Sequence, residues 1–256
     1  MNKTLALLAS IAVSVSMFSA SAQFGPPGAL AGPKLGGATA KLFGDNQTFS
    51  ATMVMQTSNE GKPIAMTGKL SYDTGKSRFE MNFADTPGMT TQNAAQMKTM
   101  GMDRIVAINR PDKKVTYSVF PGLQSYVEKD LSDAMPATTA ASDYKVETAE
   151  IGKDTVDGHP CVKNKVTVTD KDGKPHVSTV WNATDLKNFP LKIQSTEDGG
   201  DVTMSFKNIS LTKPDAGLFE APSEYTKYSN PQVMFQQQLM KRMGGMGMPQ
   251  PGMPQQ

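Results

Sequence analysis

The sequence contains a single cysteine, Cys161, among 256 residues. One thiol cannot form a disulfide within the chain, so the fold must be stable without covalent cross-links. A block of like charge is also missing, because 26 Lys and Arg residues are balanced by 24 Asp and Glu residues. Without a basic stripe to hold phosphates, we expect no nucleic-acid partner.

Long apolar runs are absent except near the N-terminus, where residues 5–18 are apolar or small. This run is too short to cross a hydrocarbon layer of about 30 Å. Lys3 precedes it, and Ala20-Ser21-Ala22 supplies a small-residue cleavage pattern. We therefore predict a signal peptide over residues 1–22, cleaved after Ala22, and a periplasmic or secreted protein with no integral membrane segment.

Two further segments have too few β-branched and aromatic residues to pack. Residues 23–44 are predicted to be a Gly/Pro-rich flexible leader, and residues 244–256 a Met/Pro/Gly-rich disordered tail. Thioether ligands favour Cu(I), so copper binding by the tail is one alternative function. Its candidate methionines are Met240, Met243, Met246, Met248 and Met253.

The remaining domain, residues 45–229, is dominated by alternation of apolar and polar residues, which predicts strands. The alternation predicts one solvated face and one dry face, as in an antiparallel sheet. The expected strands cover residues 49–55, 64–72, 79–83, 105–107, 115–119, 125–127, 162–168, 177–181, 191–193 and 202–206.

Helices are few in the sequence. A short helix is expected over Thr90–Met100, with Thr90 or Thr91 as N-cap, and a turn near residues 131–135. A C-terminal helix is predicted over residues 230–243, because Asn230 can cap it and Pro231 suits its first position. Its expected apolar stripe consists of Phe235, Leu239 and Met243.

Many strands and few helices predict a mainly β fold: a curved antiparallel sheet forming an incomplete (half) β-barrel with two or three short covering helices. The interior of such a barrel is either filled by side chains or left open for one apolar ligand, and methionine suits both cases. The residues expected to line the dry face, and any ligand on it, are Phe79, Met81, Tyr117, Trp181, Ile193, Met204 and Phe206.

Three runs carry a family resemblance: Gly-Lys-Asp-Thr-Val-Asp-Gly-His-Pro-Cys at 152–161, Trp181 followed by Asn-Phe-Pro-Leu-Lys at 188–192, and Leu-Phe-Glu-Ala-Pro-Ser-Glu-Tyr at 218–225. Over about residues 48–228 the chain resembles an uncharacterised family of exported bacterial proteins, a domain of unknown function. That family is similar to the periplasmic lipoprotein-carrier superfamily (LolA, LolB and LppX-like). The resemblance implies an incomplete β-barrel, lidded by helices, that shelters acyl chains.

The sequence offers few candidate catalytic residues. His159 and Cys161 flank Pro160, but a nucleophile pair needs an orienting third group and a metal needs more ligands. We therefore expect no enzyme activity, no cofactor and no metal site in the domain. The predicted function is binding of an apolar ligand, such as an acyl chain or lipoprotein. Besides the copper-binding tail, the alternative is interaction with another envelope protein.

Overall fold

The computed structural model describes residues 35, 37–59, 62–86, 89–131, 144–197 and 200–244. The predicted signal peptide, most of the predicted leader, residues 132–135 and the tail from residue 245 lie outside these ranges. Among the described residues, no helix has the length and apolar character needed to cross a membrane.

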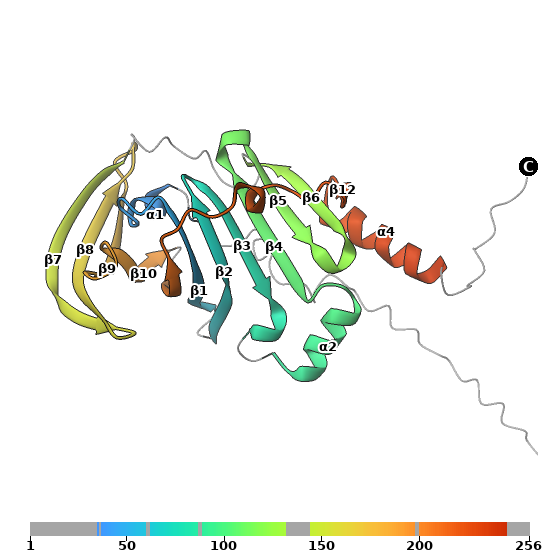
Figure 1. Ribbon diagram of the computed structural model, residues 1–256, viewed down its shortest axis with the longest axis horizontal. Helices are drawn as coiled ribbons and strands as arrows, with labels where there is room; N and C mark the ends of the chain where they lie inside the picture. Colours follow the sequence, from blue (N-terminus) through green and yellow to red (C-terminus); the bar gives the residue numbers. More distant parts are fainter. Residues whose placement is uncertain are drawn as a thin grey trace, which may run out of the picture.

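The described residues form one open sheet of twelve strands, in the order β12-β6-β5-β4-β3-β2-β1-β11-β10-β9-β8-β7 (Figure 1). The first six strands form one meander: β1 Thr48–Asn59, β2 Lys62–Asp73, β3 Lys76–Asn82, β4 Arg104–Arg110, β5 Val115–Phe120 and β6 Ser125–Asp130. The next five form a second: β7 Lys145–Val156, β8 His159–Thr169, β9 Pro175–Ala183, β10 Phe189–Glu197 and β11 Gly200–Ser210.

The two meanders join in the middle of the sheet, where β1 pairs with β11 and Met53 lies opposite Phe206. The last strand, β12 (Thr226–Tyr228), adds to β6 in a parallel direction, whereas the other neighbours are antiparallel. The sheet does not close, which confirms the predicted half-barrel. β7 was not predicted because both of its faces are largely exposed, so its sequence does not alternate.

Three helices are described: α1 Ala38–Lys41, α2 Thr91–Thr99 and α4 Pro231–Gly244. The predicted caps are confirmed, since Thr90 Oγ1 accepts from the Asn93 N–H at 3.2 Å and Asn230 Oδ1 accepts from the Val233 N–H at 2.8 Å. Short 3₁₀ turns lie at η3 Phe83–Asp85, η4 Pro111–Lys113, η5 Pro121–Leu123 and η7 Ala216–Phe219.

Only part of the apolar stripe predicted for α4 packs against the sheet. Met234 is fully buried and Phe235 is partly buried, but Leu239 is 59% exposed. The helix is instead held by Gln238, whose Nε2 donates to Ser125 Oγ at 3.0 Å and to the Leu123 carbonyl at 3.3 Å. Gln238, rather than the predicted Leu239, therefore attaches this part of α4 to the sheet.

Side chains from α1, α2 and α4, and from the chain just after α1, pack on the same face of the sheet, here called the inner face. Two apolar clusters occupy it: one over β1–β3 and β8–β11, and one over β4–β6 beneath α2 and α4. Phe83 packs against both clusters and links them. The opposite face, here called the outer face, carries a third cluster over β4 and β5.

Candidate ligand-binding face

Six of the seven residues predicted to line a ligand belong to the inner-face cluster over β1–β3 and β8–β11, and cross-strand pairing joins five of them into one surface. Phe79 pairs with Leu70, Met81 with Gly68, and Phe206 with Met53. Met204 pairs with both Met55 and Ile193, which extends the apolar surface from β1 to β10. Paired residues of antiparallel strands project to the same side, so these side chains form one continuous surface. The five predicted residues, Phe79, Met81, Ile193, Met204 and Phe206, are each at most 5% exposed.

One end of this surface is filled by an aromatic side chain from the residues after α1. The ring centroid of Phe43 lies 4.9 Å from that of Phe49, 5.9 Å from that of Phe189 and 5.5 Å from that of Phe206. Phe43 is 1% exposed, so the last residues of the predicted flexible leader belong to the core instead. At this end the barrel interior is filled by side chains.

The other end, near the tips of the β1–β2 and β10–β11 hairpins, is closer to solvent. Met55 pairs with Met66 there, and Val202 lies opposite Thr57. Met55, Met66 and Val202 are partly buried, and we call these three residues the methionine rim. Flexible, polarizable thioethers adapt their shape to an apolar partner, so the rim is the part of the inner face best suited to contact one.

A glycine shapes the floor beside the rim. A Cβ at Gly68 would lie 2.5 Å from the ring of Phe79 and 2.6 Å from the Glu80 carbonyl oxygen. The ring of Phe79 therefore lies directly over β2, and only a residue without a side chain permits this approach.

A polar row interrupts the apolar inner face on β3, β4 and β5. Asn109 Nδ2 donates to Ser77 Oγ at 3.1 Å, and Thr116 Oγ1 donates to Asn109 Oδ1 at 2.9 Å. Ser77 and Thr116 are each 5% exposed. The apolar pattern of the sequence does not predict this row, although Asn109 follows Ile105 and Ala107 at strand spacing. The row gives the inner face a polar region beside its apolar one.

The prediction that Tyr117 lines the same face is wrong. Tyr117 pairs with Ile108 and Glu128 and packs in the outer-face cluster with Phe219. Its neighbour Ser118 lies on the inner face instead, opposite Ala107. β5 is buried on both faces. Its more apolar side is the outer one, which is covered by the C-terminal chain rather than by the helices.

Trp181 belongs to the same core cluster as Ile193, Met204 and Phe206, but the two residues opposite it in the sheet are lysines. The register puts Val180 opposite Ile193, whereas Trp181 pairs with Lys192 and Lys163. The two ammonium groups lie 4.6 Å and 4.9 Å from the ring centroid, within reach of cation–π attraction. Trp181 is 4% exposed, and lysine side chains cover its ring.

An acidic partner fixes the orientation of this indole. Trp181 Nε1 donates to Asp154 Oδ2 at 2.9 Å, and this hydrogen bond lowers the pKa of the Asp154 carboxyl. The ring is thus held by Asp154 on β7 and by the lysines on β8 and β10. The arrangement ties the edge strand β7 to β9.

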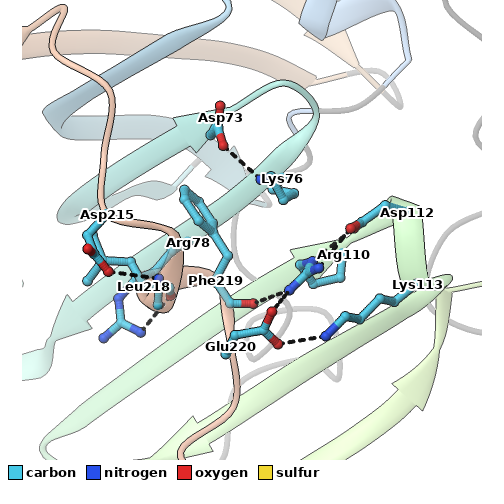
Figure 2. Close-up of polar contacts among 11 residues, drawn as sticks. Asp73, Lys76, Arg78, Arg110, Asp112, Lys113, Asp215, Leu218, Phe219 and Glu220 are labelled. Carbon is cyan, nitrogen blue, oxygen red and sulfur yellow. Dashed lines mark hydrogen bonds and ion pairs between the residues drawn. The ribbon is translucent and has the colours of Figure 1, made fainter.

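The outer face of β3–β5 is crossed by residues 211–225, here called the strap (Figure 2). Phe219 is fully buried among Val106, Ile108, Tyr117 and Val119. Arg110 Nη1 donates to the Phe219 carbonyl at 3.1 Å and forms an ion pair with Glu220. Lys113 Nζ pairs with the other Glu220 oxygen at 2.8 Å.

Arg110 is the centre of this contact. Its side chain is 8% exposed, and its guanidinium also holds Asp112 by two bonds of 2.8 and 2.7 Å. The hydrogen bond from Arg110 lowers the pKa of Asp112 to about 2, and Lys113 and Arg110 lower the pKa of Glu220. The strap is thereby fastened to β4 by charged groups that stay ionised at neutral pH.

The candidate nucleophile pair does not form an activated site. Cys161 is 3% exposed, its thiol donates to the His159 carbonyl at 3.4 Å, and burial raises its pKa, which disfavours the thiolate. His159 Nδ1 contacts Asp185 Oδ2 at 2.8 Å, away from that thiol. Within the described ranges, no group of three His, Cys, Asp or Glu side chains is placed to hold a metal ion. The tail methionines Met246, Met248 and Met253 lie outside those ranges.

The fold and its faces define a class: an open antiparallel half-barrel with helices packed on an apolar inner face. The chain belongs to the family described as domain of unknown function DUF4412, whose model matches residues 49–189. No curated protein sequence matches the chain.

Several solved structures are similar to the chain at low sequence identity. A LolA superfamily protein from Nitrosomonas europaea is 7% identical, with a TM-score of 0.38, over 72% of this chain and 94% of that one. The lipoprotein LppX from Mycobacterium tuberculosis is 12% identical, with a TM-score of 0.39, over 72% and 96%. A putative outer membrane lipoprotein-sorting protein domain from Vibrio parahaemolyticus is 11% identical, with a TM-score of 0.33, over 77% and 94%.

Proposed function

We propose that this protein is exported and binds, without chemically converting it, a molecule that carries a long apolar chain. The observation that carries the proposal is the methionine rim: Met55, Met66 and Val202 are partly exposed and continue directly into buried Met204 and Ile193. A ligand chain laid over the rim covers apolar surface that now contacts water.

The energy of such contact is sufficient for useful affinity. Each methylene removed from water contributes about 0.8 kcal/mol. A chain of about 14 carbons can therefore reach micromolar affinity after the costs of association are subtracted. Phe79, Met81, Ile193, Met204 and Phe206 form the proposed floor under the chain, and the rim its entrance.

A pair of variants on neighbouring residues of β1 tests the proposal. Met55 and Val54 are both partly buried and lie on opposite faces, since Met55 pairs with Met66 and Val54 with Thr67. Met55→Lys should weaken binding of a fluorescent fatty-acid analogue by tenfold or more, because a charge must then be buried under the chain. Val54→Lys, the matched control, should leave the affinity unchanged.

Natively purified protein should also carry a lipid detectable by mass spectrometry. If the protein is lipid-free and the analogue does not bind, the inner face is a filled core and the proposal is wrong. Export is tested separately: the mature chain should begin at Gln23 by intact-mass measurement, and a retained Met1 would contradict it.

A further inference from the structure

Tyr228 is an inner-face tyrosine at the edge of the sheet, in β12. It pairs with Val127 of β6 in the parallel ladder, and it packs in the cluster beneath α2 and α4 with Phe120 and Met234. Tyr228 is only 6% exposed. A polar hydroxyl thus lies inside an apolar cluster.

The hydroxyl oxygen of Tyr228 is buried and has no hydrogen-bond partner among the residues that the structure describes. Buried polar atoms in proteins are nearly always paired, because burial without a partner is costly. By contrast Tyr72, another buried inner-face tyrosine, accepts a hydrogen bond from the Gly75 backbone. Among the described residues, the hydroxyl of Tyr228 is therefore an unpaired donor within an apolar cluster.

Cross-strand pairing connects this donor to the proposed floor. One row runs Phe79–Ala107–Ser118–Val127–Tyr228, each residue opposite the next on β3, β4, β5, β6 and β12. The row spans four strand spacings, at most about 19 Å along the sheet. Ala107 and Ser118 have the smallest side chains of the row. The side chains of the row therefore project least from the sheet between its two aromatic ends.

We propose that Tyr228 donates a hydrogen bond to a neutral carbonyl oxygen, an ester or amide, at the head of the bound molecule, whose chain follows this row towards Phe79 and the methionine rim. The inference rests on the proposed function and adds the polarity of the ligand to it. A neutral carbonyl fits better than a carboxylate, because burying an unpaired charge among apolar side chains costs far more. The hydrogen-bonded residues Ser77, Asn109 and Thr116 run beside this row on β3–β5, and their polar groups bond to one another rather than to the bound molecule.

The test compares two ligands that differ only in the carbonyl: monohexadecanoylglycerol and its ether analogue, hexadecylglycerol. The full mature chain should bind the ester about three- to tenfold more tightly than the ether, the range expected for one neutral hydrogen bond. Tyr228→Phe should bind both with the affinity that the unaltered chain has for the ether. Tyr72→Phe, which removes a hydroxyl that already has a partner, should keep the preference for the ester.

Three results would overturn the inference. If the ester and the ether bind equally well to the unaltered chain and to Tyr228→Phe, the inference is wrong while the proposed function stands. If neither ligand binds the unaltered chain, the proposed function fails together with it. A melting temperature of unliganded Tyr228→Phe below that of the unaltered chain would show that the hydroxyl is already satisfied, whereas we expect it to be equal or higher.

Discussion

Arg110 on β4 and Glu220 on the strap form an ion pair between residues 110 positions apart in the chain. Arg110 is buried, whereas Glu220 is 47% exposed and also pairs with Lys113. The strap leads from β11 in the middle of the sheet to β12 at its edge. The ion pair therefore helps to place β12 and α4, and with them Tyr228, at the edge of the sheet next to β6.

Glu220→Gln should loosen the strap without unfolding the sheet. We expect a loss of about 0.5–1 kcal/mol in the free energy of unfolding, because Glu220 is half exposed and solvent screens the pair. Urea unfolding should show it, and hydrogen exchange of the strap amides should rise. Glu224→Gln is the matched control, since its one hydrogen bond on the strap, with Ser223, is long at 3.4 Å. Equal stability of both variants and the unaltered chain would contradict the role of the pair.

The strap contact should weaken in acid. The pKa of Asp112 is lowered from 3.8 to about 2 and that of Glu220 is lowered from 4.5, so both carboxyls bind protons less readily in the folded state. Their contribution is fully present above about pH 5 and is lost as the pH falls towards 2. The stability difference between the unaltered chain and Asp112→Asn/Glu220→Gln should shrink over that range. A difference that stays constant from pH 6 to pH 2.5 would rule this out.

Phe43→Ala should be among the most damaging substitutions, although Phe43 precedes the first strand. We expect a loss of about 3–5 kcal/mol, because a fully buried ring leaves a cavity between Phe49, Phe189 and Phe206. Thermal unfolding measures it, and Lys41→Ala in α1 serves as the control for helix effects. A loss below about 1 kcal/mol would mean that Phe43 does not fill the inner face.

Gly68→Ala should destabilise the sheet by about 1–3 kcal/mol through overpacking against the ring of Phe79. Phe79→Leu in the same chain removes part of that clash, so the double variant should be more stable than the sum of the two single effects predicts. Additive losses in a denaturant series would show that the ring does not lie over Gly68.

Trp181 fluorescence should be a poor reporter of ligand binding. Its ring is held by Asp154, Lys163 and Lys192, and Trp181 pairs with Lys192 rather than with Ile193, so we expect a chain on the inner face not to touch the ring. We expect no emission shift on adding an apolar ligand, whereas Asp154→Asn should shift the emission in the unliganded protein. The emission of the Met66→Trp variant should respond to the ligand. A large shift of Trp181 emission on binding would contradict this placement.

Local sequence patterns predicted most strands and two helix caps correctly, since these depend on neighbouring residues. Thr90 and Asn230 cap the helices they were expected to cap, and the alternation in 49–55 and 202–206 identifies the inner-face residues of β1 and β11. Period-two alternation reports burial of one side of a strand, whichever partner buries it.

Which partner covers each side of a strand depends on contacts between segments that are far apart in the chain. Tyr117 is buried by the strap, Trp181 by lysines, and Phe43 closes the inner face from a Gly-rich stretch that its composition marks as flexible. The pairing of β1 with β11, and of Tyr228 with Val127, joins residues that are far apart in the sequence. Local patterns were enough to place most of the strands and their apolar sides. Long-range pairing determined which of those sides face the helices, because a strand buried on both faces carries no sign of its partners.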